Sequence, residues 1–393
     1  MNVLRRMSTA RLLAAIAVVA ALAMAAGIAV ARGGSGPRPP HRPLAVAIRQ
    51  ALAAKPVAGL SARITFTNHL FPSGAIAAGA GSALLNGASG RLWVGGDGRF
   101  RLELQSDTGD TQIMGGTGAI RVYDASSNQM YVLPLATSGP ATNAHAGHAH
   151  PLPAVGAITR VLQRLTAVAN VTGAVPGDIA GRPVYSVRIA PRHDGGLLGG
   201  LQLAWDAQHG VPLKVAVYSR GDSSPVLALT ATEVHYGAVS NADLNVRPPA
   251  SAKVTTITLP GAATPRRDAH GRTVTGLAAV RGKLGFPLAA PASIAGLPRQ
   301  TVRLVDGGGH TGAVVVYGRG LGAIAVLEQA AGGTSGSAPG PLAALPRVSI
   351  GGASGQELAT ALGTLLRFER GGVSYTLVGS VPAVAAEAAA RSL

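Results

Sequence analysis

The sequence contains no cysteine, so a disulfide framework, thiolate chemistry and a cysteine-ligated metal site are all excluded. A lipid anchor on an N-terminal cysteine is excluded for the same reason. Aromatic residues make up only 4% of the chain, so valine, leucine, isoleucine and alanine must fill the core. Charged residues make up 13% and hydrophobic ones 47%, which is typical of a folded chain and not of a disordered one.

Recognisable catalytic motifs are also scarce. We find no G-x-S-x-G, no H-E-x-x-H and no P-loop, and the spacing of the 17 acidic residues indicates no acid–base pair. His145, His148 and His150 could in principle chelate a metal, but no acidic residue or cysteine stands near them to complete a ligand set. We interpret them as part of a solvated loop. The sequence therefore predicts a protein that is not an enzyme and needs no metal or cofactor.

Basic residues dominate the charge, with a formal net charge of +17. The arginines are spread along the chain, without a basic block interleaved with aromatics and without a zinc or helix-turn-helix signature, so nucleic acid is not an expected partner. We interpret the arginine bias first as a consequence of genomic base composition, with the basic surface serving solubility. The functional alternative is attraction to an anionic membrane surface or a polyanion.

The N-terminus has the pattern of an export segment. Arg5, Arg6 and Arg11 precede an uncharged run over 12–31 that ends in the small-x-small triplet Ala-Val-Ala. We predict that residues 1–31 are a signal peptide or an N-terminal membrane anchor, because the run 12–31 is long enough to span a bilayer. Residues 32–43 are a predicted linker rich in glycine and proline. Both alternatives place the rest of the chain outside the cytoplasm, in the cell envelope or secreted.

Alternating hydrophobic residues predict an antiparallel sheet between residues 60 and 232. One side of each strand is apolar and the other polar, and turn residues join successive strands. We predict that the apolar side is both core and ligand cavity, lined by Phe100, Leu102, Leu104, Leu203, Trp205, Leu213, Val215 and Val217.

Helical spacing of apolar residues predicts two helices that flank or interrupt these strands, at 43–54 and 154–169. We expect the second helix to lie over the sheet as a lid. A proline-rich passage suggests a boundary near 262, which separates a domain at 44–261 from a smaller α+β domain at 262–393. In the smaller domain we expect strands, a helical turn within 351–366, and a terminal helix at 381–391 with Ser380 as its N-cap.

Several runs resemble a known family. The run LAWDAQHGVPLKV at 203–215 is similar to paired strands of the LolA/LolB/LppX superfamily of envelope lipoprotein and lipid carriers. The runs at 234–244 and 246–254 resemble the last strand of that family and its proline-rich tail. The run YTLVGSVPAVA at 375–385 is similar to the small C-terminal domain of MucB/RseB-type sigma-factor regulators.

The resemblance implies a mostly β fold of the α+β kind, a curved antiparallel half-barrel with helices over its open face. It also implies two functions. The first is binding of a lipid or lipoprotein acyl chain in an apolar cavity, as a carrier or a sensor. The alternative is a regulatory protein that binds the extracytoplasmic part of an anti-sigma factor.

Overall fold

The structure is a computed structural model of the protein. The structure describes residues 36–71, 83–107, 109–116, 118–134, 154–192, 196–245, 247–256, 264–265, 273–307, 310–332 and 345–393. The predicted export segment at 1–31 and the histidine loop with His145, His148 and His150 lie outside these residues. No helix in the described part of the chain combines the length and the hydropathy that crossing a membrane requires.

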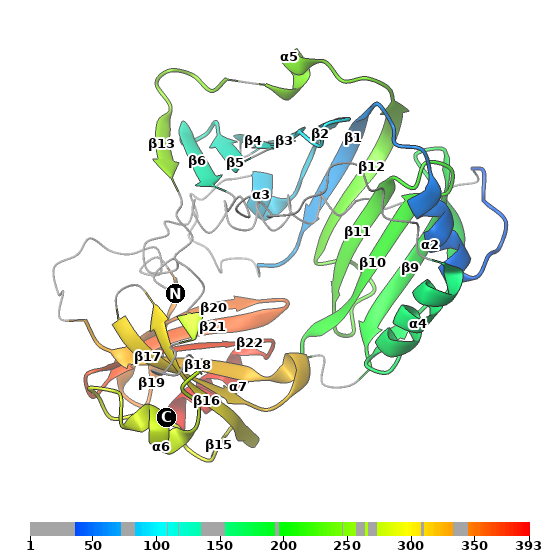
Figure 1. Cartoon of the computed structure of the whole chain (residues 1–393). Helices are drawn as coiled ribbons and strands as arrows, with labels where there is room; N and C mark the ends of the chain where they lie inside the picture. The colour runs from blue at the N-terminus through cyan, green and yellow to red at the C-terminus, as the bar shows by residue number, and fades with distance from the viewer. Residues whose placement is uncertain are drawn as a thin grey trace.

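Within the described residues, thirteen strands form a first sheet in the order β13-β6-β5-β4-β3-β2-β1-β12-β11-β10-β9-β7, with β8 paired to β9. The sheet is a curled half-barrel (Figure 1). Its pairs are antiparallel except for β13 with β6. The strands are β1 (Gly59–Asn68), β2 (Ala88–Gly95), β3 (Phe100–Ser106), β4 (Gly109–Gly115), β5 (Ala119–Asp124), β6 (Gln129–Pro134), β7 (Ala169–Val171), β8 (Val175–Ile179), β9 (Arg182–Pro191), β10 (Leu198–Asp206), β11 (Pro212–Ser219), β12 (Leu227–Tyr236) and β13 (Lys253–Thr256).

This sheet confirms the mostly β fold class that the sequence predicted. Alternation predicts strands near 61–68, 92–94, 99–104, 120–124, 130–133, 184–189, 201–205, 213–217 and 226–234, and the structure has a strand at each of these places. The strands that we missed are β4, β7, β8 and β13. They are short or rich in glycine, proline and polar residues, as in Gly109-Asp-Thr-Gln, so they carry little alternation. Neighbouring strands hold them in place through backbone hydrogen bonds instead.

The helices that accompany the first sheet are α2 (Leu44–Ala53), α3 (Ala83–Asn86), α4 (Val155–Leu165) and α5 (Asn241–Leu244). The predicted helix at 43–54 agrees with α2. The predicted helix at 154–169 is shorter than expected, because Ala169 already begins β7 and pairs with Pro191 of β9. The helix α4 packs against α2 beside β9 and β10 (Figure 1).

A second sheet follows, ordered β14-β16-β17-β18-β22-β21-β20-β19 in the described residues, with β15 paired to β16. Its strands are β14 (Thr264–Pro265), β15 (Ser293–Ile294), β16 (Leu297–Gly307), β17 (His310–Tyr317), β18 (Ile324–Ala330), β19 (Arg347–Ile350), β20 (Ala353–Thr360), β21 (Gly363–Arg370) and β22 (Val373–Gly379). The helices α6 (Leu277–Arg281) and α7 (Ala383–Arg391) and the short 3-10 helix Gly320–Gly322 accompany it. The division of the chain into two domains at 262 stays a prediction.

Two local predictions in this part are wrong. The stretch 351–366 contains the hairpin of β20 and β21 and no helical turn, because Thr360 Oγ1 closes a tight turn by accepting from the Gly363 amide at 3.1 Å. The N-cap of α7 is Pro382, not Ser380. The Ser380 hydroxyl instead donates to Leu362 O at 2.8 Å and accepts from the amide of Leu197.

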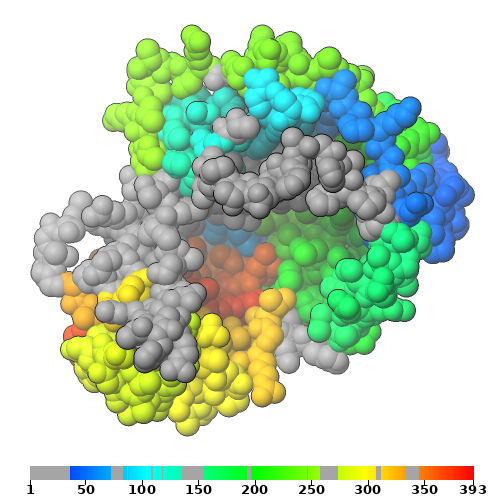
Figure 2. Space-filling view, in the orientation of Figure 1, coloured from blue at the N-terminus to red at the C-terminus, as the bar shows by residue number. Residues whose placement is uncertain are grey.

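The two sheets touch through residues that leave β1 and precede β10. The amide of Ala361 donates to Leu70 O at 2.8 Å, and Phe71 packs against Leu345 and Leu358. The amide of Leu197 donates to Ser380 O at 3.0 Å. The face of the molecule between β10–β12 and the second sheet is hollowed in Figure 2.

Candidate functional site

The predicted cavity residues all lie on one face of the first sheet, which we call the apolar face. Residues that pair directly across antiparallel strands point to the same side of a sheet, and so do residues two positions apart on one strand. These rules connect the β3 residues to the β10 residues. The direct pairs are Leu104–Gly90, Gly90–Ile64, Phe66–Leu229, Leu229–Val215 and Val215–Leu203, and Ile64 and Phe66 are two positions apart on β1.

The protein's own side chains already cover most of this face. Leu102, Leu104 and Leu213 are each 1% exposed, and Trp205 is also buried. Phe100, Leu203, Val215 and Val217 are half-buried. The buried side chains form two clusters, however: Leu102, Leu104 and Leu213 belong to one, and Trp205 belongs to another together with Leu203. The role of these residues as a ligand cavity stays a prediction.

Two helices lie on the apolar face at its two ends. The single-turn helix α3 contacts β1, β3 and β4, and its Leu84 is buried in the same cluster as Leu102 and Leu104. Asn68 Nδ2 holds α3 in place by donating to Leu84 O at 2.6 Å. In Figure 1, α3 lies inside the curl of the sheet. Alternation cannot find such a helix, because one turn contains too few residues to show a helical period.

At the other end, α2 covers β9 and β10. Ala47 of α2 is buried against Tyr185 and Trp205, whose ring centroids are 6.2 Å apart. The predicted linker contributes here as well, since the Tyr185 hydroxyl donates to Pro40 O at 2.6 Å. Leu203 and Trp205 therefore pack against α2, whereas Leu102 and Leu104 pack against α3.

The turn within the run at 203–215 is organised by a buried carboxylate. Asp206 is 1% exposed, and its Oδ1 accepts from the amides of Gln208 and His209 at 2.7 and 2.9 Å. Its Oδ2 accepts from the Tyr236 hydroxyl at 2.8 Å. Burial first, and then this hydrogen bond, raise the pKa of Tyr236. The acidic residue of the motif thus fixes the β10–β11 connection, and Gly210 completes the turn with a φ of 66°.

The opposite face carries charged residues that are tied to the fold. Arg101 lies 4.8 Å from the Trp93 ring centroid, and it donates to Glu103 at 2.6 Å and to Asp243 O at 3.3 Å. These contacts attach α5 to the outside of β2 and β3. Arg101 is therefore structural, which the sequence did not indicate.

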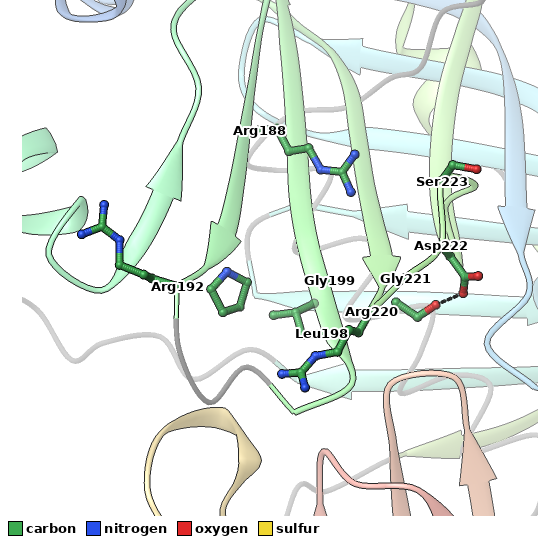
Figure 3. A pocket seen from close by; sticks show the side chains of 10 residues that line it. Arg188, Arg192, Leu198, Gly199, Arg220, Gly221, Asp222 and Ser223 are labelled. Carbon is green, nitrogen blue, oxygen red and sulfur yellow. Dashed lines mark hydrogen bonds between the residues drawn. The ribbon is translucent and has the colours of Figure 1, made fainter.

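Sequence reasoning also missed a pocket at the far end of β9–β11, which we call the arginine pocket (Figure 3). Its volume is about 520 Å³. It is lined by Arg188, Pro191, Arg192, Leu198, Gly199, Ser219, Arg220, Gly221, Asp222 and Ser223. Its arginines come from β9, from the residue after β9 and from the start of the β11–β12 turn, so only the fold brings them to one place. Within the described residues, no group of histidine and acidic side chains could hold a metal ion.

Comparison with known proteins gives likenesses of fold. No family model and no curated protein matches the chain. Among solved structures, the chain is similar to the MucA/MucB complex of Pseudomonas aeruginosa, with 18% identity over 88% of this chain and 94% of the other, at a TM-score of 0.38. A crystal structure of MucB in complex with MucA(peri) aligns with 17% identity over 89% of this chain and 95% of the other, at a TM-score of 0.37.

A LolA superfamily protein from Nitrosomonas europaea aligns with 10% identity over 52% of this chain and 99% of its own length, at a TM-score of 0.22. Both groups that the sequence resembles are thus found among the similar solved structures, and the similarity concerns the fold alone.

Proposed function

We propose that this protein is an extracytoplasmic carrier or sensor that binds the acyl chain of a lipid or lipoprotein on its apolar face. The observation that carries the proposal is the large apolar cluster on that face, which runs from Leu104 on β3 to Leu213 on β11 across a curled sheet. A curved apolar surface suits a flexible hydrocarbon chain, because hydrophobic contact is not directional. Binding of this kind needs no cofactor and no catalytic step.

The acyl chain would take the place of α3. Leu102 and Leu104 are fully covered with α3 in position, so a ligand reaches them only when this helix leaves the face. Removal of α3 exposes Ala83 and Leu84, which costs roughly 3–4 kcal/mol at the usual value for buried apolar side chains. An acyl chain of about 16 carbons contributes roughly 12 kcal/mol when fully buried, at about 0.8 kcal/mol per CH₂. Burial of a long acyl chain can therefore repay the loss of α3 and part of the cost of association, and a single helical turn has little stability of its own to oppose the exchange.

Two measurements test the proposal. The first is native mass spectrometry of the protein purified from its own envelope, in which we expect a bound lipid. The second is titration with a fluorescent acyl probe, for which Leu102→Asp should reduce binding at least about tenfold. A carboxylate at this apolar position must lose its water or become protonated, at a cost of several kcal/mol.

The matched control is Thr65→Asp, because Thr65 is exposed on the opposite face of β1, between Ile64 and Phe66. It should bind the probe like the parent. Since Leu102→Asp could unfold the core, circular dichroism must accompany it, and Val217→Trp provides a milder variant at a half-buried position. If the parent neither carries lipid nor binds the probe, the proposal fails. That outcome would favour a regulator that binds the extracytoplasmic part of an anti-sigma factor.

A further inference from the structure

The arginine pocket gathers positive charge without matching negative charge. Among the described residues, no carboxylate lies within ion-pair distance of Arg188, Arg192 or Arg220. The carboxylate that lines the pocket, Asp222, accepts a hydrogen bond from the Ser219 hydroxyl (Figure 3). The pocket therefore has a net positive charge that the described side chains do not neutralise.

A fourth cation lies beside Arg188. The cross-strand pairs Arg188–Gln202 and Gln202–Ala216 put Arg188 on the same face as Lys214, which stands two residues before Ala216 on β11. Lys214 is only 7% exposed and forms no ion pair within the described part of the chain. Its burial, and then the charge of Arg188, lower its pKa to about 8. Two cations are thus held close together at a cost to stability that a bound anion would offset.

Two of the three arginines make contacts that hold them in place before any ligand arrives. The Arg188 guanidinium lies 4.2 Å from the centroid of the Tyr218 ring, and the Tyr218 hydroxyl donates to Gln202 at 2.7 Å. Arg192 donates through Nε to Asn170 Oδ1 at 3.3 Å, and among the described residues no acceptor pairs with its two Nη groups. Gly199 packs closely on the backbone of β11, because a Cβ at this position would collide with Ser219 O.

We propose that the arginine pocket is a binding site for a phosphate group. Guanidinium groups match phosphate oxygens through paired N–H donors, and clustered arginines favour a dianion over a monovalent carboxylate. A volume of about 520 Å³ exceeds that of phosphate alone, so the pocket also admits part of the molecule that carries the group.

The phosphate site is independent of the proposed acyl-chain site. Arg188 pairs with Gln202, whereas Val187 pairs with Leu203, so the side chains of Arg188 and Leu203 point to opposite sides of β9 and β10. Failure of acyl-chain binding would leave the phosphate site untouched, and the reverse is also true.

Thermal unfolding of the full chain in the presence of inorganic phosphate tests the proposal. At matched ionic strength, phosphate should raise the Tm by about 2–5 °C relative to chloride, because a ligand of the folded state stabilises it. In Arg220→Gln the exposed side chain can be lost without harm to the fold, and the phosphate effect should fall by at least half. Arg188→Gln should abolish it.

The matched control is Arg121→Gln, which removes the same charge from an exposed position on β5. It should keep the full response to phosphate. The proposal is overturned if phosphate does not raise the Tm of the parent, or if the Arg121 and Arg220 variants respond equally, since that result means unspecific screening of the net charge.

A second arm identifies the source of the phosphate group. Phosphatidylcholine vesicles with and without phosphatidic acid are sedimented with the parent and with Arg220→Gln. Binding that requires both phosphatidic acid and Arg220 assigns the site to a lipid headgroup. Stabilisation by inorganic phosphate without such binding assigns it to a free phosphate compound. The acyl probe should bind Arg220→Gln as it binds the parent, which separates this test from that of the proposed function.

Discussion

The Tyr236 hydroxyl donates a hydrogen bond of 2.8 Å to Asp206 Oδ2 and so joins the end of β12 to the turn between β10 and β11. The ring of Tyr236 also packs against the tilted ring of His209, with centroids 4.1 Å apart, and the Arg182 guanidinium lies 5.1 Å from the Tyr236 centroid. This contact links three connections of the first sheet that are distant in sequence. It explains why the turn after Trp205 contains a buried acidic residue.

Replacement of Asp206 should therefore destabilise the protein strongly. Asp206→Ala removes an acceptor of three hydrogen bonds and leaves two amides and a buried hydroxyl without a partner, at a cost of about 3 kcal/mol. Urea unfolding gives the free energy of unfolding. The control Asp97→Ala changes an exposed turn, where the loss should be below about 1 kcal/mol. Equal losses in the two variants would contradict the role assigned to Asp206.

The same contact predicts an alkaline loss of stability. The pKa of Tyr236 is raised in the folded state, whereas in the unfolded chain it is about 10. The stabilising contribution is then complete below about pH 10 and is lost as the pH rises above this value, because only the unfolded state releases the proton easily. Measured between about pH 8 and about pH 11, the free energy of unfolding should fall less steeply in Tyr236→Phe than in the parent. Identical slopes would exclude this contribution.

The exchange of α3 for an acyl chain predicts that a weaker α3 strengthens ligand binding. Leu84→Ala should cost α3 about 2–3 kcal/mol of packing and raise the affinity for an acyl probe by roughly tenfold or more. Leu244→Ala on α5 is the control, because Leu244 is equally well buried but lies outside β2 and β3. It should destabilise the protein without tighter probe binding. Weaker binding in Leu84→Ala would mean that α3 forms part of the site.

In the second sheet, Glu328 should make stability depend on pH. Its buried carboxylate accepts from the amides of Ala289 and Ala290, yet burial outweighs these donors and raises its pKa. The contribution to stability is thus complete below about pH 4.5 and is lost as the pH rises through the folded-state pKa. Glu328→Gln removes this dependence, so the free energy of unfolding of the variant should rise relative to that of the parent between about pH 4 and about pH 8. If the difference in unfolding free energy between variant and parent does not change with pH, Glu328 does not titrate in this interval.

The export prediction can be tested directly in cells. A phosphatase that works only outside the cytoplasm, fused after Ala58 and before β1, should be active. The reason is the arginine-flanked apolar run at 12–31, which we expect to direct the remainder of the chain across the membrane. A stable but inactive fusion would refute an extracytoplasmic location.

The sequence by itself determined the sheet and its apolar face. Alternation over Phe100–Leu104 and Leu201–Trp205 requires one apolar and one polar side in any paired arrangement, because successive side chains of a strand point in opposite directions. The helix α2 could be predicted for a similar reason, since Leu44 and Ile48 recur at helical spacing. These features are local, and local periodicity records them.

Tertiary structure alone decided what covers that face and where charge collects. The position of α3 depends on a hydrogen bond from Asn68 and on strands that follow α3 in the chain. Ser380, which we expected to cap a helix, instead contacts Leu197. The arginine pocket depends on the register that places Arg188 beside Lys214 and near the turn that carries Arg220. Such relationships join residues distant in sequence, and no periodic pattern encodes them, because they arise only when the strands pair and the sheet curls.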